Sequence, residues 1–163
     1  MAAQRTRKGS RDGRGHVTAA RPRSGTREGL RGMLEGAPFP AWMCDREGRM
    51  IYLNGAFRSA VGGDGESPPS TVWRSVVDPR DLEHWGRTFQ SASVVLDPFR
   101  VEVQTGGADG RRRWYQLRGI PCSGEPDTGG YWGTAVDITS GKWRENAARE
   151  TEDRYKALAD VQD

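Results

Sequence analysis

Alternation of hydrophobic and polar side chains predicts a β-strand in the segment that begins at Phe99. Phe99, Val101 and Val103 alternate with charged and polar neighbours, which is the period-2 pattern of a strand with one buried face. Two further strands are expected at 113–122 and 131–138, where aromatic and β-branched residues gather. These three segments predict one antiparallel unit near the C-terminal end.

Turn residues indicate how neighbouring strands are joined. Asp109 and Gly110 stand between the strand that begins at Phe99 and the next one, and an Asp-Gly pair favours a tight hairpin. The segment 41–54 contains two more hydrophobic runs, separated by Asp45 at the first and Gly48 at the fourth position of a type I turn. The sequence therefore predicts two hairpins and a fifth strand.

Helices are expected where hydrophobic residues lie three and four positions apart. Leu30, Met33 and Leu34 follow this spacing and predict a short amphipathic helix over 26–36. Asn54 precedes a second short helical segment, and its side-chain oxygen is suited to capping the first turn.

A longer helix is predicted over 78–93. Asp78 is suited to the N-cap and Pro79 to the first helical position. The segment before this helix, 62–71, is rich in Gly, Ser and Pro, so we expect a surface loop there.

The order of these elements predicts an α+β domain with one five-stranded antiparallel sheet, flanking short helices, an N-terminal amphipathic helix and a C-terminal helix. Trp114 and Tyr115 are neighbours in one strand, so their side chains point to opposite faces of the sheet. We expect both to be buried. The face away from the central helices then needs a cover, which is either the N-terminal helix or a second copy of the protein.

Charge is unevenly distributed along the chain. The net charge is +3, but residues 1–31 hold nine of the 25 Lys and Arg and only two of the 22 acidic residues. Residues 1–25 have almost no large hydrophobic side chains, so we expect a disordered basic tail. The tail has no aromatic side chain to stack on bases; nucleic acid is therefore not the expected partner, although binding through the tail stays an alternative.

Several classes of protein are not indicated. No hydrophobic run reaches the roughly 20 residues that span a bilayer, and no signal peptide is recognisable, so the cytoplasm is the default location and no membrane partner is expected. Cys44 and Cys122 lack the spacing of a zinc site, and no metal is expected. Phosphate-loop, hydrolase, metalloprotease and histidine-kinase phosphoacceptor motifs are missing from the sequence, so no catalytic residue or enzymatic domain is predicted.

Four stretches in order resemble a PAS domain with its C-terminal PAC motif: CDREGRMIYLN, VVDPRDLEHW, DGRRRWYQLRGIP and GTAVDITSGKWRE. The resemblance covers about residues 30–142. It implies a sensory and dimerisation module of bacterial signal transduction, as in sensor histidine kinases of two-component systems, cyclic-dinucleotide enzymes and transcription regulators. It also assigns Gly110 and Trp114 to the structure of the PAC motif.

The resemblance gives a role to the sequence Asp137-Ile138-Thr139. In similar proteins these residues brace the exit of an output helix, and here an Asp at a strand end is suited to accept backbone N–H bonds from the first helical turn. An ordinary strand stop is the alternative. We thus divide the chain into a tail (1–25), a PAS/PAC sensory domain (26–139) and a C-terminal linker helix (140–163).

A ligand pocket is expected between the predicted long helix and the strand at 99–104, with a candidate lining of Leu82, Trp85, Phe89, Phe99, Val101 and Val103. An open pocket there favours ligand sensing, whereas a filled core favours a purely structural dimerisation module. Neither cysteine has the surroundings of a covalent flavin site. His84 points about 130° away from the apolar face of its helix, so haem is not expected, and the ligand stays unidentified.

Partners are expected at both ends of the domain. A homodimer is predicted through the 26–36 helix and the residues after Ser140, since both carry hydrophobic stripes. The segment near Tyr155 resembles the lead-in to a further PAS domain, so a downstream output domain or a partner kinase is expected.

Overall fold

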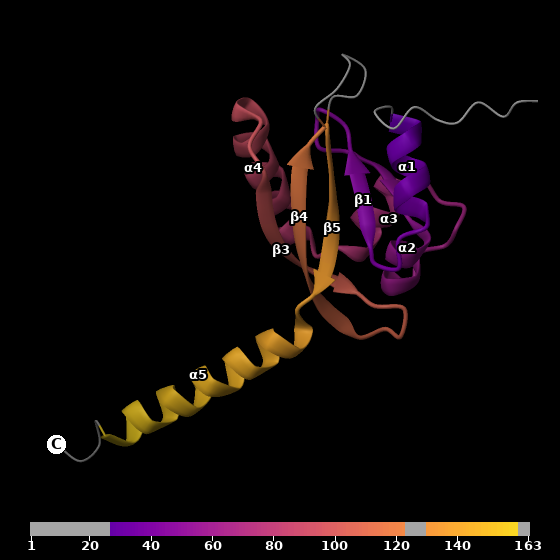
Figure 1. Ribbon diagram of the computed structural model, residues 1–163. Helices are drawn as coiled ribbons and strands as arrows, with labels where there is room; N and C mark the ends of the chain where they lie inside the picture. Colours follow the sequence, from indigo (N-terminus) through magenta and orange to yellow (C-terminus); the bar gives the residue numbers. More distant parts are fainter. Residues whose placement is uncertain (1–26, 123–129, 160–163) are drawn as a thin grey trace, which may run out of the picture.

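The structure of the protein is a computed structural model that describes residues 27–122 and 130–159 (Figure 1). The predicted basic tail, residues 1–25, lies outside the described residues. Ten helices and strands follow one another in the order α1 (Arg27–Glu35), β1 (Ala41–Cys44), β2 (Met50–Leu53), α2 (Gly55–Val61), α3 (Pro69–Val76), α4 (Pro79–Val95), β3 (Phe99–Gly106), β4 (Arg112–Pro121), β5 (Tyr131–Asp137) and α5 (Thr139–Ala159).

The five strands form one antiparallel sheet in the order β2-β1-β5-β4-β3. The predicted α+β fold with a five-stranded antiparallel sheet is confirmed. The last strand in the chain, β5, lies in the middle and pairs with β1 on one side and β4 on the other (Figure 1). Strand β5 is therefore hydrogen-bonded to both halves of the sheet.

Helices α2, α3 and α4 pack on one face of this sheet around an aromatic core. The ring centroids of Trp42 and Trp85 are 5.3 Å apart, and those of Trp85 and Phe99 are 5.4 Å apart. Both pairs are T-shaped, the geometry in which the edge of one ring meets the face of another. Phe89 and Tyr131 extend the cluster with a third T-shaped pair at 5.4 Å.

The opposite face is covered over only part of its width. Leu34 of α1 packs with Ala41, Met43 and Tyr52 in a second, smaller core. The N-terminal helix, one of the two covers that the sequence predicted, therefore lies over β1 and β2. Tyr115 lies in the main core, which confirms that it and Trp114 face opposite sides. The expected burial of Trp114 was wrong. Helix α1 covers β1 and β2, whereas only Lys142 of α5 lies over the ring of Trp114, whose side chain is therefore half-buried.

Helix α3 corrects the loop predicted at 62–71, because it begins at Pro69. Proline is tolerated in the first turn of a helix, where its missing N–H has no partner to lose. Val72 and Trp73 of α3 are buried against the main core. Tertiary packing thus stabilises a helix whose first residues are typical of a loop.

The predicted start of α4 is confirmed. Asp78 accepts a hydrogen bond from the backbone N–H of Arg80 at 3.0 Å, and Pro79 is the first helical residue. The helix runs slightly beyond the predicted end and stops at Leu96, which adopts a left-handed conformation with φ of 56°.

Asn54 caps α2 as predicted, and it also joins three elements. Its Oδ1 accepts from the backbone N–H groups of Phe57 (2.9 Å) and Ala41 (3.0 Å). Its Nδ2 donates to the carbonyls of Leu34 (2.9 Å) and Phe39 (3.0 Å). The side chain is fully buried, and these bonds connect the end of α1 to β1 and α2.

Replacing Asn54 with alanine leaves buried backbone groups without partners, and each such group costs about 1–3 kcal/mol. We expect Asn54→Ala to lower the free energy of unfolding by about 2–4 kcal/mol, measured by urea denaturation. Ser59→Ala, an exposed change on the same helix α2, is the control and is expected to leave the free energy of unfolding nearly unchanged. Equal stability of the two variants would contradict the role given to Asn54.

Candidate functional site

The junction between β5 and α5 contains a single residue, Ile138. Asp137 ends the strand, and its Oδ1 accepts the backbone N–H of Thr139 at 2.9 Å. Thr139 is already the first residue of α5, one residue before the predicted start of the linker helix. The carboxylate thus bridges the strand and the helix, as expected for Asp137.

The same junction is bonded to the neighbouring strand β4. The backbone N–H of Ile138 donates to the carbonyl of Trp114 at 2.8 Å, and the backbone N–H of Trp114 donates to Oγ1 of Thr139 at 2.9 Å. The pairing of β4 with β5 therefore continues past the end of β5 into the first residue of the helix. Thr139 holds α5 to the sheet through its hydroxyl, a bond that the sequence analysis did not anticipate.

One turn further on, Lys142 attaches α5 to the uncovered face of the sheet. Its Nζ lies 2.5 Å from Oε2 of Glu102 in β3 and 5.2 Å from the ring centroid of Trp114. The hydrogen bond from Lys142 lowers the pKa of Glu102 against the opposing effect of burial. The same bond raises the pKa of Lys142. The first turn of α5 is therefore connected to both β3 and β4.

The β3–β4 hairpin turn also contacts the junction. Arg113 lies 2.8 Å from Asp109 in the turn and 3.7 Å from Oδ2 of Asp137. Gly110 adopts a φ of 74° in this turn, a conformation that favours glycine. The two residues assigned to the PAC motif, Gly110 and Trp114, thus lie in the turn and the strand that contact the junction.

The predicted pocket between α4 and β3 is filled by side chains. All six candidate residues belong to the main core, where Trp85, Phe89, Val101 and Val103 are buried and Leu82 and Phe99 pack at its edge. The ring centroids of Phe89 and Phe99 are 6.0 Å apart, so helix and strand are in direct contact. The structure brings the predicted residues together in one packed cluster.

A cleft of about 560 Å³ opens instead beside α4. Three of the predicted residues line it: Leu82, Trp85 and Phe89. Its other walls are the turn between β1 and β2, with Arg46 to Met50, and helix α3, with Ser70, Trp73 and Arg74. The sequence analysis missed these walls, because residues of the turn and of α3 come together only in the folded chain.

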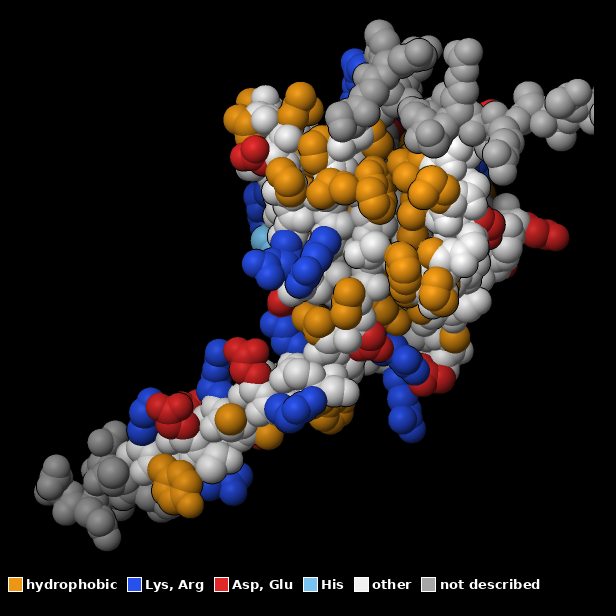
Figure 2. Space-filling model, in the orientation of Figure 1, with side chains coloured by type: hydrophobic (Ala, Val, Ile, Leu, Met, Phe, Trp, Pro, Cys, Tyr) orange, Lys and Arg blue, Asp and Glu red, His pale blue; other side chains and the backbone are white. Residues whose placement is uncertain are grey.

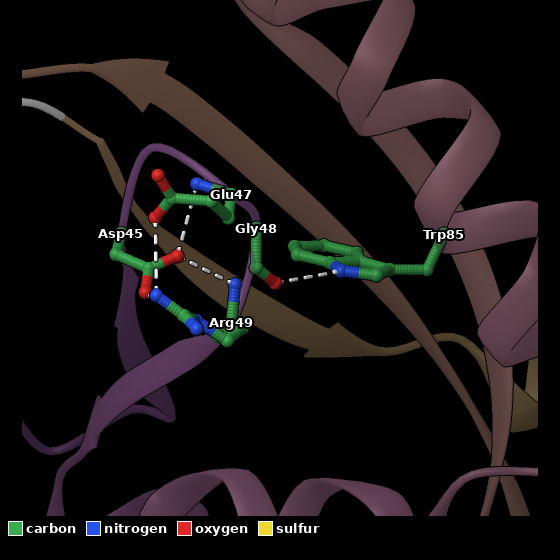
Figure 3. A network of polar contacts seen from close by, with 5 residues as sticks. All are labelled: Asp45, Glu47, Gly48, Arg49 and Trp85. Atoms are coloured by element: carbon green, nitrogen blue, oxygen red, sulfur yellow. Dashed lines mark hydrogen bonds and ion pairs between the residues drawn. The ribbon is translucent and has the colours of Figure 1, made fainter.

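The β1–β2 turn that borders this cleft is held by a compact set of hydrogen bonds (Figure 3). Oδ1 of Asp45 accepts from the backbone N–H groups of Glu47 (3.0 Å) and Arg49 (2.9 Å), and Oδ2 lies 2.8 Å from Nε of Arg49. Burial alone would raise the pKa of Asp45, but these bonds outweigh it and keep the pKa below its ordinary value. The ionised carboxylate therefore stabilises the turn at neutral pH.

Helix α4 contacts the turn directly. The indole Nε1 of Trp85 donates to the carbonyl of Gly48 at 3.2 Å (Figure 3). Gly48 has a φ of 78°, and a Cβ at this position would lie 2.7 Å from the ring of Phe89. The turn thus lies against the aromatic core at a position where only glycine fits.

The remaining candidate residues lie apart from the cleft and the junction. His84 is exposed on α4, as predicted. Cys44 is buried in β1, and burial raises its pKa to about 12; Cys122 follows β4, with β5 between the two. Within residues 27–122 and 130–159, no group of three His, Cys, Asp or Glu side chains is placed to hold a metal ion, and no helix is both long and apolar enough to cross a membrane.

Known proteins share this fold. A PAS domain of an HTR-like protein from Haloarcula marismortui is 18% identical, with a TM-score of 0.54 over 67% of this chain and 88% of that one. The PAS domain of BvgS from Bordetella pertussis is 22% identical, with a TM-score of 0.52 over 80% and 96% of the two chains. A PAS domain from Colwellia psychrerythraea is 21% identical, with a TM-score of 0.56 over 69% and 97%.

Sequence comparison agrees with the fold. The family model described as PAS fold matches residues 34–142, a span that includes the cleft and the junction. The chain therefore belongs to the PAS fold family, whose members are sensory rather than catalytic domains. The uncharacterized protein y4lL of Sinorhizobium fredii is 25% identical over 134 residues, and this chain spans 16% of the length of that relative.

The bond between Lys142 and Glu102 predicts a pH dependence at the start of α5. The folded-state pKa of Glu102 is lowered. The stabilisation that its ionised carboxylate gives to the first turn of α5 is therefore complete above the ordinary pKa of about 4.3 and is lost as the pH falls through the lowered pKa. We expect the amides of Thr139 to Trp143 to exchange faster below about pH 4, measured by hydrogen exchange. The pair is partly exposed, so the effect is at most about 1 kcal/mol.

Glu102→Gln is the control for this titration. The variant keeps the length of the side chain but cannot ionise, so its exchange rates are expected to show no step in this pH range after correction for intrinsic exchange. A step of equal size in the variant would assign the titration to another group.

Proposed function

We propose that this chain is a sensory module that passes a conformational change in its sheet to helix α5. The continuous bonding from β4 through Trp114 to Ile138 and Thr139 supports this most directly. A strand that merely ended would need none of these cross-strand bonds at the first residue of the next helix. Here the helix begins as an extension of the sheet.

The first turn of α5 is suited to following movements of the sheet. Asp137 holds it to β5, Thr139 to β4 and Lys142 to β3. A change in the relative position of these strands would therefore tilt or release the helix, which projects away from the sheet (Figure 1). Trp143 and Tyr155 are about 70% exposed along it, so they are available to a downstream output domain or partner kinase.

The proposed context is a cytoplasmic bacterial two-component system or a related regulator. The neighbours in structure include the PAS domain of BvgS and a domain of the putative light and redox sensing histidine kinase from Haloarcula marismortui. The activity of the whole protein, and the identity of its output, belong to this proposal.

Dimerisation is a second proposed function, and it is compatible with the first. The face of β4 and β5 beside α1 carries exposed Ile120 (41%) and Val136 (50%), next to half-buried Trp132 at the edge of the smaller core. Figure 2 shows hydrophobic side chains gathered on this face, next to α1. Met33 of α1 is 70% exposed and extends the surface. Exposed hydrophobic patches of this kind mark protein interfaces, and a second copy is the proposed partner.

The relay is tested by Asp137→Ala in a chimera that joins residues 26–160 to a heterologous histidine-kinase core. Loss of the cap costs about 0.5–2 kcal/mol, whereas a domain of this size has about 5–15 kcal/mol of stability, so the fold is expected to survive. We expect the autophosphorylation rate to change by about 2- to 30-fold, the ratio that corresponds to this energy.

Asp153→Ala is the matched control, since Asp153 is exposed on α5 away from the junction; it is expected to leave the rate unchanged. Thr139→Ala is expected to act like Asp137→Ala, because it removes the bond to Trp114. If Asp137→Ala and Asp153→Ala gave the same rate as the unmodified chimera, the junction would be a simple strand stop.

The proposed dimer is tested by placing a charge on the uncovered face. We expect the unmodified chain to sediment as a dimer at about 50 µM and Val136→Lys to sediment as a monomer, because a buried unpaired charge is strongly unfavourable. The control is Val94→Lys, an equally polar change on α4 at a residue that is 80% exposed. A dimer that persists in Val136→Lys would place the interface elsewhere, and a monomeric unmodified chain would refute dimerisation.

A further inference from the structure

The cleft beside α4 has the size and the lining of a small-molecule site. Its volume of about 560 Å³ lies within the roughly 300–1,000 Å³ common for ligand pockets. The hydrophobic part of its surface comes from five side chains, three of them aromatic: Met50, Trp73, Leu82, Trp85 and Phe89. A flat apolar body would bury well against these rings.

The charged part of the lining favours an anion. Arg46 and Arg49 contribute from the β1–β2 turn and Arg74 from α3, whereas Glu47 is the one acidic residue among those that line the cleft. Arg49 already pairs with Asp45 and Glu47.

Arg74 lines the cleft from α3. It is exposed, and within the described part of the chain no interaction of its side chain is recorded. A guanidinium group matches a carboxylate with two parallel hydrogen bonds. Arg74 is therefore the group best placed to receive an anionic ligand.

Trp73 provides a second, independent observation. Its side chain lines the cleft and is 4% exposed, yet its indole Nε1 has no hydrogen-bond partner within residues 27–122 and 130–159. Buried donors are nearly always paired, because an unpaired one is costly. An acceptor on a bound molecule that reached Nε1 would satisfy this N–H.

We propose that the cleft binds a small aromatic carboxylate, with its ring on Trp73, Trp85 and Phe89 and its carboxylate at Arg74. This inference rests on the proposed sensory function and names the class of ligand. The cleft is connected to the output helix through two strands. The β1–β2 turn follows β1 directly, and β1 pairs with β5, which ends at the junction. A ligand that draws the turn toward α3 would shift β1 against β5.

The test is a binding measurement on the full chain by calorimetry and ligand-observed NMR. The probes are benzoate, 4-hydroxybenzoate, salicylate and indole-3-acetate, together with the neutral benzamide and indole-3-acetamide. At least one carboxylate is expected to bind with a dissociation constant below about 1 mM, and its amide about tenfold more weakly. If no carboxylate shows saturable binding up to about 5 mM, or if an amide binds as tightly as its acid, the proposal is overturned.

Arg74→Gln is the main variant, and it is expected to weaken carboxylate binding about tenfold while leaving amide binding unchanged. Arg87→Gln, an exposed change on α4 outside the cleft, is the matched control and is expected to bind as the unmodified chain does. Trp73→Phe keeps an aromatic ring without the N–H and is expected to weaken both acid and amide. Carboxylate binding that survives Arg74→Gln refutes the site.

These outcomes are separate from those of the relay. The binding measurement uses no output domain, and Arg74 lies in α3, which does not belong to the junction. A negative result would therefore remove the anion site and leave the role of Asp137 standing. Tight binding together with an Asp137→Ala chimera of unchanged kinase rate would confirm the site and refute the relay.

Discussion

The pairing of β4 with β5 is the constraint on which the rest of the structure depends. It places the last strand of the chain in the middle of the sheet, where β5 also binds β1. It then continues beyond the strand, through Trp114, into Ile138 and Thr139. Helix α5 therefore has no independent orientation in its first turn. Backbone hydrogen bonds of this kind tolerate little change in geometry, which is the physical basis of the proposed coupling between the sheet and the helix.

The packed interior bears on where the proposed ligand would bind. Aromatic rings of α4 pack on those of the sheet at centroid distances of 5.3–6.0 Å, so the space between helix and strand is a close-packed core. The cleft lies outside this core, between the β1–β2 turn and helices α3 and α4. The bond between Trp85 and Gly48 connects the two, since one indole belongs to the core and also holds the turn. A ligand at the surface can thus act on the sheet without entering the interior.

Much of the fold could be predicted from neighbouring residues. The hairpin at Asp45 and Gly48, the caps at Asn54 and Asp78 and the direct passage from strand to helix at Asp137 are all present in the structure. Helix α3 could not be predicted this way, because its first residues favour a loop and its stability comes from burial of Trp73. Three residues of the candidate pocket, Leu82, Trp85 and Phe89, line the cleft. Its other walls could not be assigned from the sequence, since hydrophobic periodicity identifies a buried face and not the space left beside it.

The sequence by itself determined the number and type of the strands, the ends of most helices and the short junction at 137–139, because periodicity, capping and turn formation are properties of contiguous residues. Only the tertiary structure decided that Asn54 joins α1 to β1 and α2, that Thr139 bonds to Trp114, and that Arg74 and the β1–β2 turn share a cleft. Each of these contacts joins residues that are far apart in the chain. Which distant groups meet depends on how the whole sheet and its helices pack, and no local pattern contains that information.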